Sequence, residues 1–404
     1  MSALRRCRDS RVPMRVAFQM LGDRQWVAGE NYLRNLFHAM HESATDKAQL
    51  CLVSFNGRQH EEFARSLGAD GLISYQALSP CTPAGAINGA FKRLLLTDRA
   101  GGKFLEQNGV DVLFGRTLLH KYPRVGTLSW LPDLQHIHFP DLFTAEERAL
   151  RNETYRQSAI SSSRVILPCR AAGDDFKKLM PEYEGKVRTT HPIADIPATI
   201  YDQDPHAVLD IYHLPEKFIY LPNQFWQHKN HETLFEALAI LKRRQGLEVP
   251  VVCTGYPGDY RKAGYFASLC EKISQWNLRE QFIYLGVVPR EHVLLLMRQC
   301  VSVLNPSLFE GWGMSVDEAR SLGKQVIVSD IAAHREQNPP KAIFFDPKNR
   351  DELAEKLREV WQVSKPGPDF ELEAEARVSL PSRLAAFAGT FLAYCREVYE
   401  EVHS

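Results

Sequence analysis

Two carboxylates and two glycines lie close together in the chain, at Glu310, Gly311, Gly313 and Glu318. Glycine lets the backbone approach a ligand closely, and the free N–H groups of a helix start attract phosphate or a polarised sugar hydroxyl. Glu310 precedes the turn and Glu318 lies within a predicted helix, so the two carboxylates suit different parts of one ligand. The alternative is a simple turn beside a solvated helix residue.

The segments before and after this turn predict the secondary structure that holds it in place. An apolar run at 301–304 leads into the turn, and a helix-compatible run follows at 315–322. Gly323 is a typical helix stop, and 325–329 has the composition of a buried strand. Strand, glycine turn, helix and strand in this order are the sequence form of a βαβ unit.

Residues 308–336 resemble the donor-binding motif of retaining GT-B glycosyltransferases of glycosyltransferase family 4. The similarity lies in Phe309-Glu310-Gly311-Trp312-Gly313, against the family's F-E-G-F-G, and in Glu318-Ala319 with Gly323 and Val326-Ile327, against its E-A-x-x-x-G-x-P-V-I. Ser315 and Gln325 depart from the pattern, since proline is usual at both positions. The resemblance implies that Glu310 orients the donor sugar and that Glu318 accepts the ribose hydroxyls. It further implies that the turn residues Gly311, Trp312, Gly313 and Met314 stabilise the leaving diphosphate.

A basic residue precedes the first long helix of the second half of the chain. Lys229 follows a predicted strand at 218–222 and comes just before a helix at 232–244. An ammonium group there suits a phosphate, although a solvated lysine is the alternative. In family 4 this strand end reads G-R-x-x-x-x-x-K-N, and Lys229-Asn230 matches its K-N. Asn223 replaces the arginine. This departure implies that the diphosphate is stabilised less strongly or that another basic residue compensates.

Two further candidates rest mainly on the resemblance. Gly29 begins a helix after the first predicted strand, and the family places this glycine near the donor phosphates; a simple helix start is the alternative. Val288 follows the strand that ends near Gly286, and the family uses this segment to line the nucleotide base. An apolar side chain there suits a protein core equally well.

The loop at 131–140 holds three polar candidates, Asp133, His136 and His138. A metal site is weakly indicated, because no cysteine or acidic partner lies at a typical spacing. A proline-rich loop with a capping residue is the plainer interpretation. The resemblance implies a third, in which Asp133 matches an acidic motif that faces the reacting sugar and the acceptor, with His136 close behind. Trp130 stands where that motif has a histidine.

The order of apolar runs and helical segments predicts the fold class. Short apolar runs alternate with helices in both halves, which is typical of open, mostly parallel α/β sheets. We therefore expect a GT-B arrangement, with two Rossmann-like doubly wound domains facing a central cleft. Residues 1–200 would form the acceptor-side domain and 201–380 the nucleotide-sugar donor domain, with a linker near 192–213. A terminal helix at 381–404 would cross back to the first domain; a dimer contact is the alternative for its apolar stripe.

Composition excludes some classes of function. Lysine plus arginine and aspartate plus glutamate both number 49, so no net charge recruits nucleic acid. No apolar stretch is long enough for a membrane span, and the scattered cysteines are typical of buried thiols in a reducing compartment. We expect a cytoplasmic protein. Peripheral contact with the inner face of the membrane could come from the basic start of the chain, at Arg5, Arg6, Arg8 and Arg11.

These observations predict a retaining glycosyltransferase that takes a UDP- or GDP-sugar and extends a glycan or lipid-linked acceptor, as in surface polysaccharide synthesis. No metal ion or other cofactor is expected, because a lysine and helix N–H groups can stabilise the leaving diphosphate. Two alternatives stay open. One is a non-catalytic nucleotide-sugar-binding or scaffold protein, which Asn223 favours; the other is a sugar-nucleotide epimerase of the same fold.

Overall fold

The computed structural model describes residues 13–21, 27–43, 48–54, 60–74 and 82–404. The chain forms two compact units, which are described separately. Unit 1 contains residues 1–132, 149–192 and 384–404, and unit 2 contains 133–148 and 193–383. The predicted division fell after residue 200 and left 133–148 in the first domain. The arginines proposed for membrane contact, Arg5, Arg6, Arg8 and Arg11, lie outside the described residues.

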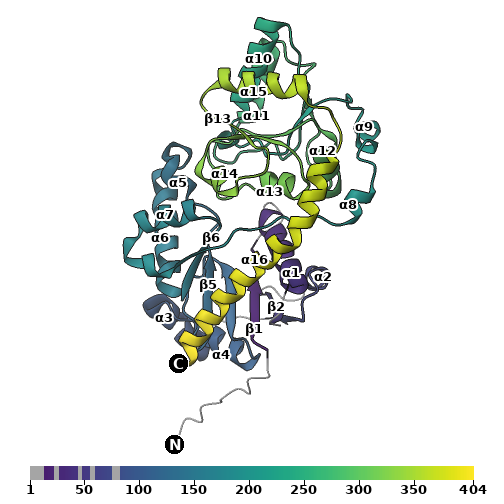
Figure 1. Cartoon of the computed structure of the whole chain (residues 1–404). Coiled ribbons are helices and arrows are strands. Elements are labelled where there is room, and N and C mark those ends of the chain that lie inside the picture. Colours follow the sequence, from purple (N-terminus) through teal and green to yellow (C-terminus); the bar gives the residue numbers. More distant parts are fainter. Residues whose placement is uncertain (1–12, 22–26, 44–47, 55–59, 75–81) are drawn as a thin grey trace, which may run out of the picture. The chain divides into compact units, whose positions relative to one another are not determined.

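Unit 1 contains a parallel sheet of seven strands in the order β3-β2-β1-β4-β5-β6-β7 (Figure 1). Its strands are short and largely buried, as expected for a sheet that helices cover on both faces. They are β1 (Arg15–Gln19), β2 (Gln49–Ser54), β3 (Gly71–Ser74), β4 (Val112–Arg116), β5 (Gly126–Trp130), β6 (Arg164–Leu167) and β7 (Val187–Thr189). The helices are α1 (Val27–Ser43), α2 (Glu61–Ser66), α3 (Pro83–Leu95), α4 (Arg99–Gln107), most of α6 (Ala145–Ser161), α7 (Arg170–Leu179) and η3 (Pro181–Lys186).

The end of the last helix, α16 (Phe370–His403), belongs to the core of unit 1. The ring centroid of its Phe391 lies 5.7 Å from that of Phe18 on β1. A Cβ atom on Gly126 of β5 would come within 2.8 Å of Val398, so only glycine permits this close approach. The prediction that the terminal helix packs on the first domain is confirmed, and it accounts for the apolar stripe.

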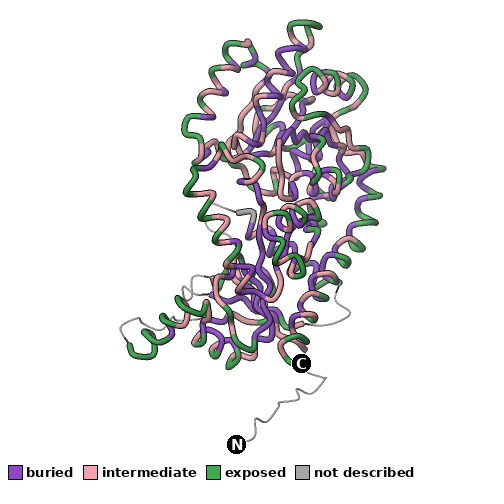
Figure 2. The backbone as a smooth tube through the Cα atoms, turned by 90° about the vertical axis from the view of Figure 1, so that its left-hand side faces the viewer, coloured by how far each residue is buried: buried purple, intermediate pink, exposed green. Residues whose placement is uncertain are grey.

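Unit 2 contains a second parallel sheet, of six strands in the order β10-β9-β8-β11-β12-β13. The strands are β8 (Ile219–Leu221), β9 (Val251–Cys253), β10 (Phe282–Tyr284), β11 (Val303–Asn305), β12 (Val326–Ser329) and β13 (Ile343–Phe345). The helical elements are α5 (Gln135–His138), η2 (Pro140–Leu142), α8 (Thr199–Asp202), α9 (Ala207–Tyr212), η4 (Gln227–Lys229), α10 (His231–Gln245), α11 (Tyr265–Gln275), α12 (Arg290–Gln299), α13 (Met314–Ser321), α14 (Ala332–Gln337) and α15 (Arg350–Val363). In both units the buried residues gather in the sheet (Figure 2).

Two expectations about the connections differ from the structure. The segment predicted as a linker, 192–213, holds the short helices α8 and α9. The terminal helix is not a separate piece from residue 381, because α16 runs continuously over 34 residues with Pro381 inside it. Its length is what lets one helix contribute to both units. Among the described residues, no helix combines the length and apolar character that a membrane span requires.

Candidate functional site

Lys229 and Glu310 form the centre of the candidate site in unit 2. Lys229 ends η4, the single helical turn between β8 and α10, and Asn230 then takes a left-handed backbone with φ of 59°. Lys229 Nζ lies 2.7 Å from Glu310 Oε1 and 2.9 Å from Oε2. The two side chains are only 14% and 8% exposed. The structure thus brings together two residues that the sequence placed 81 positions apart.

Glu310 is held in its ionised form by several donors. Ser307 Oγ donates to Glu310 Oε1 at 2.7 Å, and Asn305 Nδ2 donates to the same oxygen at 3.3 Å. Burial by itself would raise the pKa of Glu310, but the charge of Lys229 and these hydrogen bonds outweigh it and leave the pKa lowered. A carboxylate therefore stands beside an ammonium group at the mouth of the turn.

The glycine turn leads directly into α13. Gly313 has φ of 95° and caps the helix without a side chain, so the first N–H groups of α13 lack a side-chain cap. Only glycine adopts this backbone without strain. Gln337 Nε2 on α14 donates to Gly313 O at 3.0 Å and fixes the turn from behind. The predicted helix at 315–322 is confirmed as α13, whereas the anion site at its start stays a prediction.

His334 also faces this turn, and sequence reasoning missed it. The ring is fully buried, and its Nδ1 lies 2.9 Å from Ser329 O. Burial lowers the pKa of His334 more than the charge of Glu310 raises it, so the ring is neutral with its proton on Nδ1. Nε2 has no hydrogen-bond partner and lies 3.4 Å from where a Cβ of Gly313 would be. No local pattern marked this residue, because its role depends on packing.

Glu318 pairs with a basic residue that the sequence did not single out. Arg290 Nη1, at the start of α12, lies 2.5 Å from Glu318 Oε1. The side chains are 35% and 12% exposed, so this pair is more accessible than Lys229–Glu310. Arg290 follows Val288, which is partly buried, and Val287, which is 73% exposed. The connection from β10 to α12 therefore carries an exposed apolar side chain and a guanidinium, and the guanidinium pairs with a carboxylate on α13.

Asn223 and Ser315, both departures from the family pattern, contact one another. Ser315 Oγ lies 3.4 Å from Asn223 Oδ1 and accepts a hydrogen bond from Asn305 Nδ2 at 3.2 Å. Because Asn305 also donates to Glu310, hydrogen bonds connect Asn223 with the central carboxylate. Asn223 is only 4% exposed, and its Nδ2 has no partner. A buried amide donor left unpaired is costly, and such groups are exceptions in folded proteins.

The loop with Asp133 and His136 belongs to unit 2. Arg261 connects it to the site, because its guanidinium donates to Gln135 Oε1 and, at 3.3 Å, to Nδ1 of His228. The ring centroid of His138 lies 5.1 Å from that of Phe309, the residue before Glu310. His136 is buried, and Asp133 accepts a hydrogen bond from the Gln135 amide at 3.0 Å. The structure thus places this loop beside the residues that flank Lys229 and Glu310.

The remaining predicted residues lie as follows. Trp312 is buried and Met314 begins α13. Gly29 is a buried residue in the first turn of α1 in unit 1, and the loop residues 22–26 before it lie outside the described part. Within the described residues, no group of three or more His, Cys, Asp or Glu side chains could hold a metal ion.

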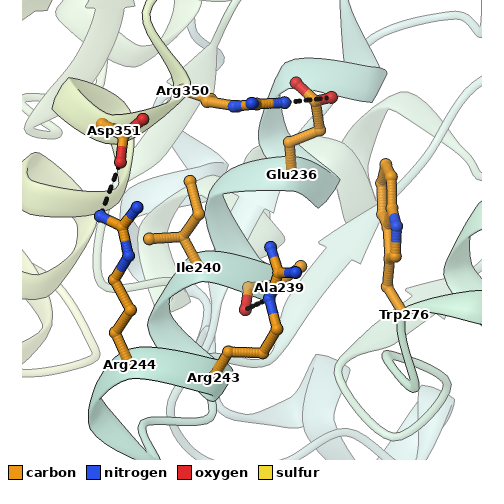
Figure 3. Close-up of a pocket in the computed structure, with 8 residues that line it drawn as sticks. All are labelled: Glu236, Ala239, Ile240, Arg243, Arg244, Trp276, Arg350 and Asp351. Atoms are coloured by element: carbon orange, nitrogen blue, oxygen red, sulfur yellow. Dashed lines mark hydrogen bonds and ion pairs between the residues drawn. The ribbon is translucent and has the colours of Figure 1, made fainter.

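A separate pocket on unit 2 contains none of the predicted site residues. It has a volume of about 290 Å³ and lies between α10, the end of α11 and the start of α15 (Figure 3). Two of its arginines form ion pairs, Arg244 with Asp351 at 2.7 Å and Arg350 with Glu236 at 2.9 Å, and Arg243 donates to the carbonyl of Ala239. These pairs are exposed to solvent and contribute little to binding or stability.

Two parallel α/β units, with a glycine turn that leads into a helix beside a buried lysine, define a GT-B protein. The sequence profile of the family "Glycosyl transferases group 1" matches residues 207–371, all of which lie in unit 2. The resemblance found in the sequence is therefore confirmed at the level of the domain family and the fold.

Curated relatives match parts of the chain. O-antigen chain mannosyltransferase B of Escherichia coli is 27% identical over 127 residues, which is 31% of this chain and 32% of that protein. Serotype-specific mannosyltransferase WbdA of Escherichia coli is 23% identical over 250 residues, 62% of this chain and 28% of that protein. The matched segments thus span about a third or less of these relatives.

Solved structures share the fold over nearly the whole chain. A glycosyltransferase from Rickettsia africae ESF-5 superposes with a TM-score of 0.62, at 16% identity, covering 96% of this chain and 98% of that one. Anabaena Alr3699/HepE in complex with UDP and glucose gives 0.61 at 14% identity, covering 96% and 99%. At these identities the likeness concerns the fold.

Proposed function

We propose that this protein is a retaining glycosyltransferase that transfers a hexose from a nucleotide-activated donor to a glycan or lipid-linked acceptor. The observation that supports it most directly is the pairing of Lys229 with Glu310 beside the uncapped start of α13. A cation and helix N–H groups suit a diphosphate, and a carboxylate next to them suits sugar hydroxyls.

Each residue has a role in this proposal. Lys229, the first N–H groups of α13 and Asn223 Nδ2 stabilise the diphosphate as the bond between the sugar C1 and the phosphate oxygen breaks. Glu310 orients the donor sugar, and Glu318 accepts the ribose hydroxyls. The acceptor oxygen bonds to C1 from the face that the phosphate leaves. Its proton passes to the leaving phosphate, so no metal ion or separate base is required.

Asp133 and His136 position the sugar and the acceptor hydroxyl in this scheme. The loop that carries them is held by Arg261 next to His228, the neighbour of Lys229. Val287 and Val288 line the nucleotide base. Arg290, the partner of Glu318, supplies a positive charge near the donor and so compensates for the arginine that Asn223 replaces.

The comparisons support the substrate class. Two relatives are named as mannosyltransferases, one of them of O-antigen chains, and a protein of similar fold was solved with UDP and glucose. We therefore propose a UDP- or GDP-hexose as the donor, with a role in the synthesis of a surface polysaccharide. Gly29 would lie near the donor phosphates.

Thermal unfolding with and without nucleotides tests this proposal. UDP, GDP, ADP and CMP and their hexose conjugates are added with and without magnesium, because a ligand that binds the folded state raises the melting temperature. We expect a metal-independent shift with UDP or GDP, and slow release of the nucleotide from the matching sugar conjugate. Binding of a nucleotide-sugar without release of the nucleotide favours a scaffold protein. The presence of Asn223 in place of arginine supports that alternative. No shift with any nucleotide contradicts both.

A further inference from the structure

Helix α3 of unit 1 exposes an apolar stripe. Pro83, Ile87, Ala90 and Leu94 follow one another at helical spacing, and all four are exposed. Ile87 is 60% and Leu94 78% exposed, which places both among the large apolar side chains that remain accessible in the described residues. We call these four residues the α3 stripe. A surface helix normally turns such a stripe toward the core.

The polar side of α3 faces the domain instead. Asn88 is 8% exposed, and its Nδ2 donates to Asp98 Oδ1 at 3.0 Å. Lys92 Nζ lies 2.6 Å from Asp98 Oδ2. Asp98 is 2% exposed and also caps α4 by accepting from the Gly101 amide at 2.8 Å. One buried carboxylate thus holds two polar side chains of α3 at the start of α4. The two helices are neighbours in unit 1 (Figure 1).

This arrangement fixes the orientation of the helix. Rotation of α3 to bury Ile87 and Leu94 would withdraw Asn88 and Lys92 from Asp98 and leave a buried carboxylate without its cation. Such a loss is strongly unfavourable and opposes the free energy that burial of two aliphatic side chains would gain. The contacts with Asp98 therefore keep the α3 stripe exposed to solvent. An exposed apolar face is typical of a contact surface.

Positive charge surrounds the stripe. Arg93 on α3 and Arg99 and Lys103 on α4 are all exposed. Residues 82–124 carry seven lysines and arginines against three aspartates and glutamates, although the whole chain has 49 of each kind. The three exposed cations on α3 and α4 therefore accompany the apolar stripe and favour a negatively charged partner.

We propose that α3 binds the surface of an anionic lipid bilayer. The α3 stripe would enter the boundary between head groups and acyl chains, while Arg93, Arg99 and Lys103 contact lipid phosphates. A second copy of this chain fits less well, because a two-fold interface through this face would bring the same cations close to one another. Two large apolar side chains are also a small core for a stable dimer. Lipid binding does not depend on the proposed enzymatic activity.

Flotation of the full chain with vesicles tests this inference. Vesicles of phosphatidylcholine alone are compared with vesicles that contain about 30% phosphatidylglycerol, at low and high salt. We expect binding to the anionic vesicles that weakens with salt. The double change Ile87→Gln and Leu94→Gln should weaken it at least about tenfold, because two apolar side chains no longer enter the lipid. The melting temperature should not fall, since both side chains are exposed.

A matched control is Val363→Gln on α15, which removes an apolar side chain that is 81% exposed in unit 2. It should leave flotation unchanged. Arg93→Gln should weaken binding to anionic vesicles and leave binding to neutral ones unchanged. The inference is overturned if the wild-type chain does not float, or if the double variant floats equally well. It is also overturned if light scattering shows a dimer that the double variant abolishes while its flotation persists.

Discussion

Lys229 Nζ contacts both carboxylate oxygens of Glu310, at 2.7 and 2.9 Å. The sequence assigned these residues to different parts of one donor, the diphosphate and the sugar. In the structure each instead neutralises the other in a largely buried position. A diphosphate that binds to Lys229 must therefore compete with Glu310 for the ammonium group. A sugar hydroxyl that binds to Glu310 makes it easier for Lys229 to exchange the carboxylate for the diphosphate.

Lys229→Met should reduce both turnover and stability. The change leaves a buried carboxylate without its cation, which costs about 3 kcal/mol of unfolding free energy. It also removes a charge from the leaving diphosphate, so kcat should fall by about a hundredfold. Urea unfolding and steady-state kinetics measure the two effects. The double variant Lys229→Met, Glu310→Gln should regain most of the stability and none of the activity; an equally unstable double variant would mean that the pair does not act as a unit.

The stability of the protein should depend on pH through Glu310. Its pKa is lowered in the folded state, so the carboxylate stabilises the fold above the ordinary glutamate value of 4.5. That contribution should disappear as the pH falls below 4.5 and through the folded-state pKa. Melting curves of the wild-type protein and of Glu310→Gln between pH 3 and about 7 isolate the effect of this one group. A stability difference that does not change with pH would contradict it.

Glu318→Gln should weaken nucleotide binding with little effect on the fold. The carboxylate accepts ribose hydroxyls in the proposed scheme, and loss of charged hydrogen bonds of this kind weakens binding about tenfold to a hundredfold. Its partner Arg290 is 35% exposed, so loss of the pair costs little stability. Titration calorimetry with UDP and GDP measures the affinity. Glu236→Gln, which breaks the pair with Arg350 outside the proposed site, is the matched control. Unchanged affinity in Glu318→Gln would remove the ribose assignment.

Asn223→Ala should distinguish nucleoside diphosphates from monophosphates. The unpaired Nδ2 is expected to donate to the diphosphate, whereas the Oδ1 contact with Ser315 is long, at 3.4 Å. Removing the amide should weaken the binding of UDP or GDP by about tenfold and leave UMP or GMP nearly unchanged. Ser315→Ala, which cuts only the side-chain connection, serves as the comparison. Equal losses for mono- and diphosphates would show that Asn223 supports the fold only.

Arg261→Met should loosen the segment 133–148 and destabilise unit 2. The guanidinium is 3% exposed and pairs with Asp259, which is fully buried, at 2.9 Å. Its removal leaves that carboxylate uncompensated, at a cost of about 3 kcal/mol. The exposed pair of Arg335 with Asp330 offers a control, because Arg335→Met should change stability by less than about 0.5 kcal/mol. Limited proteolysis should find new cleavage within 133–148 in Arg261→Met alone.

The sequence by itself determined the elements and the chemistry of the turn. Apolar runs such as 218–222 became β8, and the run at 315–322 became α13, because strand burial and helix periodicity are local properties. The glycine at position 313 predicted a tight turn, and the structure shows a φ of 95° there. The family motif added the roles of Glu310, Glu318 and Lys229.

Only the tertiary structure decided which side chains meet. The contacts of Lys229 with Glu310 and of Arg290 with Glu318 join positions 81 and 28 residues apart, and no local pattern encodes them. The same holds for Arg261, which draws the loop at 133–148 to unit 2, and for Asp98, which turns the apolar side of α3 outward. Pairing across elements depends on how sheets and helices pack, and the free energy of a buried charge depends on every neighbour that packing supplies.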